Sequence, residues 1–274
     1  MVVFCRMLSL LGEPIRVQGH RGSRGTHFEN TIPAILEALD AGADSIEIDL
    51  QPTSDLKVVV FHDLLLSSRL VARLDQVPFE EKALSQVNLT ELGQFGYGFS
   101  KNLKFPKQKG KLGTKIPTLE EVFELLKKRK LGINLELKRD PKREEIDPAL
   151  FADLVVNIVS KFGFEKRVYY SSFDLELLRC VKQKDPRAIL GLIVESEDFE
   201  LNELIEKGKE IKASILSPHH SVLTGPIIKA IQKEGFRIVP WTVNDPLRWQ
   251  ELIDMGIDEI ITDYPRKLVE SLRR

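Results

Sequence analysis

The sequence predicts an α/β protein in which strands alternate with helices. Three observations predict it: eight short, β-branched runs typical of strands, helix-period segments between most of them, and a length of 274 residues. Eight strands alternating with helices are the pattern of a (β/α)8 TIM barrel, which fills about 250 residues as one domain. We therefore expect a single barrel domain over residues 15–274, with a small insertion after the second strand at about residues 52–115. The expected barrel strands are Ile15–Gly19, Ser45–Leu50, Gly132–Leu137, Val168–Ser172, Ile189–Val194, Ser214–Ser217, Arg237–Thr242 and Glu259–Thr262.

Composition restricts the class of protein. The 42% hydrophobic content can fill a large core, and 40 basic against 41 acidic residues argues against a nucleic-acid binder that acts through net charge. No later apolar run approaches the roughly 20 residues of a membrane span, and the apolar N-terminus is too short for a signal peptide because Arg6 interrupts it. Cys5 and Cys180 lie far apart and suit a reducing compartment. We expect a soluble, cytoplasmic protein without nucleic-acid binding or stable membrane insertion, and leave a homo-oligomer open.

The first expected unit is a strand, a helix and a second strand. After the strand at residues 15–19, apolar residues recur at helical spacing over residues 32–39. Asn30 or Thr31 would cap this helix. The acidic strand at residues 45–50 follows the helix after a short turn.

The segment after the second strand breaks the alternation. Residues 57–62 read as a strand, but too few residues separate it from Leu50 for a parallel crossover. We expect an antiparallel hairpin that folds His62 back over the mouth of the barrel. Residues 88–92 predict a short helix. A lysine-rich run follows, for which two interpretations are open: it attracts an anionic diester or a lipid surface, or it is a solvated loop. Its lysines are Lys101, Lys104, Lys107, Lys109, Lys111 and Lys115.

Carboxylates lie on one face of two neighbouring strands. Side chains alternate along a strand, so Glu47 and Asp49 share a face, as do Glu136 and Lys138 on the third barrel strand. Because the barrel makes these strands neighbours, three carboxylates converge. A divalent cation with oxygen ligands, Mg²⁺ or Ca²⁺, relieves such repulsion most directly. Exposed carboxylates, or an ion pair between Glu136 and Lys138, are the alternative interpretation.

Two histidines stand at the ends of apolar strands, where α/β proteins bind their ligands. His20 and His62 are each followed at once by a charged residue, and Asp63 is placed to orient His62. Imidazole titrates near neutral pH and can serve as a base in one step and an acid in the next. Satisfied structural histidines are the alternative interpretation.

The order of these motifs resembles the glycerophosphodiester phosphodiesterase family. The similarity starts with His-Arg-Gly at residues 20–22, Glu-Asn-Thr at 29–31, Glu-x-Asp at 47–49 and His-Asp at 62–63. It continues to Pro265 through Ile-Pro-Thr-Leu-Glu-Glu-Val-Phe from 116, Asn-Leu-Glu-Leu-Lys from 134, Ser-Ser-Phe-Asp from 171, Trp-Thr-Val-Asn from 241 and Ile-Thr-Asp-Tyr-Pro from 261.

The resemblance implies the barrel fold, with a small domain inserted after the second strand, and a metal-dependent hydrolase that cuts glycerophosphodiesters into sn-glycerol 3-phosphate and an alcohol. It implies Glu47, Asp49 and Glu136 as ligands of a divalent metal, and His20 and His62 as the acid–base pair. We assign His20 as the proton acceptor and His62 as the donor.

Further residues are expected to contact the substrate or to support the site. Arg21 and Lys138 can neutralise phosphate charge, and Trp241 can pack on glycerol carbons. Glu29 and Asn30 can brace the first motif or reach the substrate; equally, Asn30 can only cap the helix.

The chain also departs from the family pattern. Phe28 stands where a proline is usual, and Asp55-Leu56 stands where Asp-Gly is common. The residues after His62-Asp63 run Leu-Leu-Leu-Ser-Ser-Arg-Leu in place of Pro-x-Leu-x-Arg-Thr-Thr, with Arg69 near the arginine position.

Two other functions stay open. One is a lysophospholipase D, for which residues 64–66 and 95–99 are the candidate lining of an apolar groove. The other is a barrel that binds phosphodiesters without catalysis, against which the complete set of histidines and carboxylates argues.

Overall fold

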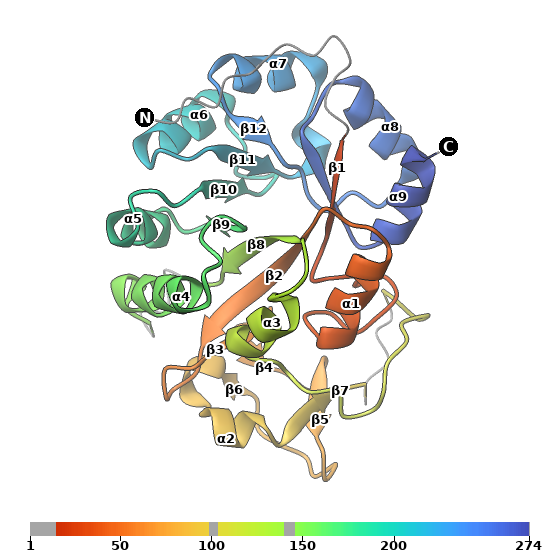
Figure 1. Cartoon of the computed structure of the whole chain (residues 1–274), viewed down its shortest axis with the longest axis vertical. Helices are drawn as coiled ribbons and strands as arrows, with labels where there is room; N and C mark the ends of the chain where they lie inside the picture. The colour runs from red at the N-terminus through yellow and green to blue at the C-terminus, as the bar shows by residue number, and fades with distance from the viewer. Residues whose placement is uncertain (1–14, 99–103, 140–145, 274) are drawn as a thin grey trace.

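The computed structural model describes residues 15–98, 104–139 and 146–273. Within them, parallel strands form the sheet of a (β/α)8 barrel, as predicted (Figure 1). Hydrogen bonds join neighbours in the order β12-β11-β10-β9-β8-β2-β1-β13. Their bounds are β1 (Arg16–Gly19), β2 (Ser45–Pro52), β8 (Gly132–Leu137), β9 (Val168–Ser172), β10 (Leu190–Val194), β11 (Ile215–Pro218), β12 (Arg237–Ile238) and β13 (Glu259–Thr262).

The barrel closes between β12 and β13 through backbone hydrogen bonds beyond the end of β12. The Ile261 amide donates to the Pro240 carbonyl at 3.0 Å, and the Val243 amide donates to the Ile261 carbonyl at 2.9 Å. The seventh strand was expected to reach Thr242, but it ends at Ile238. Pro240 has no amide to donate, so a regular ladder cannot continue through it.

Helices surround the barrel, and their apolar faces pack on the outside of the sheet (Figure 1). Thr31, and not Asn30, is the N-cap of the first of them: its hydroxyl accepts from the Ala34 amide. No described helix is long and apolar enough to cross a membrane. The helices are α1 (Ile32–Asp40), α3 (Leu119–Leu126), α4 (Pro148–Phe162), α5 (Leu175–Lys184), α6 (Leu201–Glu210), α7 (Gly225–Lys233), α8 (Pro246–Asp254) and α9 (Pro265–Leu272).

The expected hairpin after β2 is present. β3 (Val58–Val60) pairs antiparallel with β2, and the Phe61 amide donates to the Asp49 carbonyl at 2.9 Å. At the turn, Leu56 adopts a left-handed backbone with φ of 59°. A glycine would adopt this conformation without steric cost, which explains why Asp-Gly suits this turn better than Asp-Leu.

The insertion builds a small core of its own. Its elements are β4 (Leu65–Leu66), β5 (Val71–Arg73), β6 (Lys82–Ala83), η1 (Leu84–Gln86), α2 (Leu89–Leu92) and β7 (Phe95–Tyr97), in two antiparallel pairs, β4 with β6 and β5 with β7. The predicted short helix is thus confirmed as α2, with Asn88 as its cap.

Leu66, Phe95 and Tyr97 are buried inside this core, so the expectation that they line a groove is wrong. Apolar side chains this close together bury one another before they can face a ligand.

Most of the lysine-rich run lies on the surface. Lys104, Lys107, Lys109, Lys111 and Lys115 are exposed, and Lys101 lies outside the described residues. Cys180 is a free thiol, and Cys5 also lies outside the described residues.

Candidate active site

The predicted acidic cluster forms toward the C-terminal ends of β2 and β8. In the register of these strands Asp49 lies opposite Glu136, and Glu47 precedes Asp49 on the same face. One oxygen from each of the three carboxylates lies within 4.8 Å of the others, and all three side chains are buried. Period-two alternation and parallel pairing together are therefore enough to produce the cluster.

The cluster has free coordinating capacity. Among the described residues, the buried atoms Glu47 Oε1 and Asp49 Oδ1 have no hydrogen-bond partner. Such orphaned oxygens are costly in a protein interior unless a cation takes them up. Three carboxylates without a thiolate suit a hard divalent cation, and they do not distinguish Mg²⁺ from Ca²⁺. The residues present thus fit a divalent metal.

Two basic side chains flank the carboxylates. Arg21 Nε lies 3.3 Å from Asp49 Oδ2, and Lys138 Nζ lies 2.8 Å from Glu136 Oε1 and 4.0 Å from Asp49 Oδ1. Burial alone would raise the pKa of Asp49, but Arg21 in the first place holds the pKa of this carboxyl well below its ordinary value. Burial, and then Asp49 and Glu136, raise the pKa of Glu47. The two cations therefore leave one carboxylate of the cluster uncompensated.

A tight loop after β1 places Arg21 beside the cluster. Arg21 itself has φ of 51°, and its amide donates to Glu47 Oε2 at 2.8 Å. At Gly22, with φ of 80°, an added Cβ would lie 2.6 Å from the Ala34 backbone in α1. Only glycine can let the loop pack so closely on the helix.

The Glu-Asn pair supports this loop and the cluster. Glu29 Oε1 accepts from Arg21 Nη1 at 2.6 Å, and the Asn30 amide group donates to Asp49 Oδ2 at 2.8 Å. Glu29 and Asn30 therefore contact Arg21 and Asp49, and not His20. Arg24, which the sequence did not single out, also lies at Glu29, with Nε 3.4 Å from Oε2.

His20 is held by a carboxylate from the last strand. Its Nδ1 lies 2.7 Å from Asp263 Oδ1, and Asn244 donates to the other oxygen of Asp263 at 2.7 Å. This bond to a carboxylate favours the tautomer with the proton on Nδ1, which leaves Nε2, 3.9 Å from Glu47 Oε2, with a free lone pair. Burial, followed by Arg21, lowers the pKa of His20 although Asp263 opposes the shift.

His62 is held by its neighbour, as predicted. Its Nδ1 lies 2.7 Å from Asp63 Oδ1, and Arg69 binds Asp63 Oδ2 at 2.6 Å. The Gln51 amide group donates to the carbonyls of Phe61 and of Asp63 at 2.8 and 2.9 Å, and so ties the backbone around His62 to β2.

An aromatic group, Trp241 and Phe173, follows strands β12 and β9. Trp241 Nε1 donates to the Ser217 carbonyl at 2.9 Å, and its ring meets Phe173 and His219 edge to face at 5.6 and 5.4 Å. Phe173 also lies 5.4 Å from Lys138 Nζ, so it links this rim to the acidic cluster.

Comparison with known proteins identifies the family. The model of the glycerophosphoryl diester phosphodiesterase family matches residues 20–267. The chain belongs to this family. It is 31% identical, over 94% of its length and 98% of the relative's, to a glycerophosphodiester phosphodiesterase of Caldanaerobacter subterraneus.

Two solved structures, of proteins described as phosphodiesterases, carry the same fold. A protein of Silicibacter pomeroyi is 25% identical with a TM-score of 0.87 over 95% of each chain. A phosphodiesterase of Oleispira antarctica, in complex with its product sn-glycerol-3-phosphate, is 25% identical with a TM-score of 0.79, over 95% of this chain and 98% of that one. The expected fold, family and enzyme class are confirmed.

The predicted site residues of this glycerophosphodiester phosphodiesterase come from several barrel strands and the loops after them, and His62 comes from the segment after the antiparallel strand β3. Asp263, the partner of His20, and Asn244, which binds Asp263, were not predicted from the sequence. They lie in the motifs that start at residues 241 and 261, and the place of β13 beside β1 in a closed barrel is the signal that could have identified them.

Proposed function

We propose that this chain is a divalent-metal-dependent hydrolase that cleaves glycerophosphodiesters into sn-glycerol 3-phosphate and an alcohol. The observation that carries the proposal is the cluster of three buried carboxylates with orphaned oxygens, beside two histidines that are each hydrogen-bonded to a carboxylate. Glu47, Asp49 and Glu136 would hold the cation, and such an ion supplies charge neutralisation at phosphate oxygens.

Arg21 and Lys138 bind and orient the phosphate in this proposal. A phosphodiester resists attack because its anionic oxygens repel nucleophiles, so positive groups around it lower the barrier. Both side chains are already fixed by carboxylates, Arg21 by Glu29 and Lys138 by Glu136, which limits the entropy lost when substrate binds. Trp241 packs on glycerol carbons at the rim.

His20 accepts a proton from the attacking group, and His62 donates one to the leaving oxygen. The lowered pKa of His20 favours a neutral ring, and the bond to Asp263 favours the tautomer with the proton on Nδ1 and a free Nε2, so the two together support the first role. Asp63 supports the second role because its bond to Nδ1 fixes the orientation of the His62 ring.

The first test is release of glycerol 3-phosphate from glycerophosphocholine with and without a chelator, followed by re-addition of Mg²⁺ or Ca²⁺. We expect the chelator to abolish release and one ion to restore it. Release that resists thorough chelation would contradict the metal site.

A second substrate separates the histidines. A glycerophospho-p-nitrophenyl diester has a leaving group that needs no proton, so His62→Ala should retain activity on it and lose activity on glycerophosphocholine. His20→Ala should lose activity on both diesters. The reverse pattern would exchange the two roles, and unchanged turnover in both variants would show that the assignment of the two histidines as catalytic residues is wrong. A wild-type protein that binds the diester but does not hydrolyse it would favour a barrel without catalysis.

The lysophospholipase D alternative requires a place for an acyl chain. Of the side chains expected to line it, Leu66, Phe95 and Tyr97 belong to the core of the insertion, and Phe99 lies outside the described residues. The support that the sequence offered is therefore weakened. Activity on lysolipid but not on glycerophosphocholine would decide for this alternative.

A further inference from the structure

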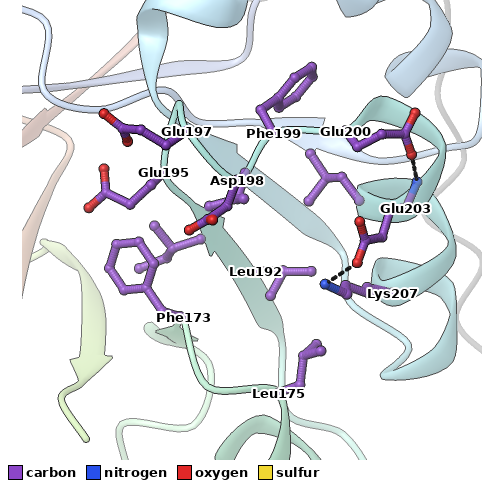
Figure 2. Close-up of a pocket in the computed structure, with 13 residues that line it drawn as sticks. Phe173, Leu175, Leu192, Glu195, Glu197, Asp198, Phe199, Glu200, Glu203 and Lys207 are labelled. Atoms are coloured by element: carbon purple, nitrogen blue, oxygen red, sulfur yellow. Dashed lines mark hydrogen bonds and ion pairs between the residues drawn. The ribbon is translucent and has the colours of Figure 1, made fainter. Parts of the chain in front are cut away.

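A cavity of about 490 Å³ adjoins the proposed active site at the C-terminal ends of β9 and β10 (Figure 2). Its walls come from Phe173, from the residues that follow β10 and from the beginning of α6. Neither the acidic cluster nor the histidines line it, so it is a separate compartment of the same rim.

Phe173 connects this cavity with the acidic cluster. Its ring is 39% exposed, which is unusual for a large apolar side chain next to a barrel core. The ring packs on Trp241 and lies 5.4 Å from Lys138 Nζ, and Lys138 is in turn bonded to Glu136. A substrate whose phosphate lies at Lys138 would therefore extend one of its ester groups along Phe173 into the cavity.

The side of the cavity next to Phe173 is acidic, and its carboxylates are free to bind a ligand. Glu195, Glu197 and Asp198 form no ion pair with any described residue, whereas Glu203 on the far side binds Lys207 at 2.6 Å. Figure 2 shows the carboxylates of Glu195 and Glu197 on the same side as Phe173, across the cavity from this ion pair. Partial burial, and then Glu197, raise the pKa of Glu195, while His219 and Lys138 oppose the shift.

Acidic side chains alone are common on a surface. Here they stand over an exposed aromatic ring and a cavity that also has apolar walls, among them Leu192, Val194 and Phe199. Aromatic faces with nearby carboxylates are the combination that binds ammonium groups, because the ring quadrupole and the negative charges both attract a cation while apolar walls contact its carbon substituents.

We propose that this cavity binds the alcohol portion of the substrate and selects alcohols that carry a positively charged ammonium group over uncharged ones. The inference rests on the proposed function, because it names the class of diester on which that site acts. Lys138 stands between the phosphate position and Phe173, and it screens the phosphate from the acids of the cavity. Diesters of choline or ethanolamine fit this arrangement, and diesters with an uncharged or anionic alcohol lack the attraction.

The test compares kcat/KM for glycerophosphocholine and for glycerophosphoglycerol, which share the glycerophosphate part and differ in the charge of the alcohol. The wild-type protein should prefer the choline diester, and the preference should shrink as salt is added. In the double variant Glu195→Gln, Glu197→Gln, the ratio of the two kcat/KM values should fall by about three- to tenfold, as expected for the loss of partly exposed charge pairs.

Glu203→Gln is the matched control, since it removes an acid from the same cavity that Lys207 already pairs. It should leave the ratio unchanged. A thermal melt of each variant checks folding. If the double variant unfolds, the single variant Glu197→Gln replaces it and should lower the ratio in the same direction by a smaller factor.

The outcomes separate this inference from the proposed function. An unchanged ratio, or an equal loss on both diesters, overturns the charge-selective subsite and leaves the hydrolase intact. Equal loss would arise if the glycerol portion occupied the cavity. No hydrolysis of either diester by the metal-loaded wild-type protein overturns the proposed function, and the subsite with it.

Discussion

Chelation should expose the electrostatic strain of the acidic cluster as a loss of thermal stability, and Glu47→Gln should relieve it. At the 4.8 Å that contains the three oxygens, two carboxylates repel by about 3.5 kcal/mol at an effective dielectric constant of about 20. Arg21 and Lys138 offset part of this repulsion, but Arg21 also pairs with Glu29, so at least one carboxylate of the metal-free cluster stays uncompensated. Glutamine keeps the oxygen that accepts from the Arg21 amide but removes the charge.

The assay is thermal unfolding in a chelator and in a saturating divalent ion. An ion at one hundred times its Kd stabilises the native state by about 2.7 kcal/mol. For a chain of this size that shifts Tm by about 5–10 °C. Wild-type protein should melt lower in the chelator by that amount, and Glu47→Gln should melt higher than wild type in the chelator yet gain little from the ion. Exposed Glu203→Gln is the control.

Two results would refute this reasoning. A wild-type Tm that no divalent ion changes would mean that the carboxylates do not bind one. A chelated Glu47→Gln variant that melts below chelated wild type would mean that Glu47 stabilises the fold through its charge.

Three further changes test how the site is held. Asp263→Asn should lower kcat by about 10²-fold or more while KM changes little, because His20 loses the partner that sets its tautomer. The pKa of Asp263 is about 2, below its ordinary value, so the stability that the Asp263 carboxylate contributes to the fold is complete above about pH 4 and is lost as the pH falls through 2. In urea unfolding across this range, the free energy of unfolding should therefore fall less steeply with acid in the variant than in the wild type. Gly22→Ala should destabilise the protein by more than about 2 kcal/mol, since its Cβ would meet the Ala34 backbone, whereas Gly163→Ala, at φ of 70° with nothing within 4 Å, should cost about 1 kcal/mol in the same denaturant titration. Replacing Lys107, Lys109, Lys111 and Lys115 by glutamine should raise KM at low salt and not at high salt if they attract the anionic substrate; unchanged kinetics would identify a solvated loop.

The residues that the sequence could place are those governed by short-range periodicity. Glu47, Asp49 and Glu136 follow from strand alternation and from a barrel order that makes β2 and β8 neighbours. The contact of His20 with Asp263 joins residues 243 positions apart, and it exists only because β13 returns to β1 when the barrel closes. Short-range sequence patterns carry no information about this pairing of the last strand with the first.

The insertion was the hardest part to predict for a related reason. Its strands are two or three residues long, too short for alternation to show which side chains face inward. Leu66 and Phe95 therefore read equally well as a groove lining and as a core, and only the packing of β4–β7 over one another decides that they are core.

The two histidines are held by different parts of the fold, because the carboxylates that bind them, Asp263 and Asp63, lie in different parts of the fold. Asp263 belongs to the barrel itself, so the orientation of His20 is as stable as the closure of β13 on β1. Asp63 lies in the insertion, where Arg69, a largely exposed side chain, supplies its other contact. Local stability is lower where fewer buried contacts hold a segment. Substitutions in the insertion should therefore disturb His62, the proposed proton donor, more than His20, the proposed acceptor.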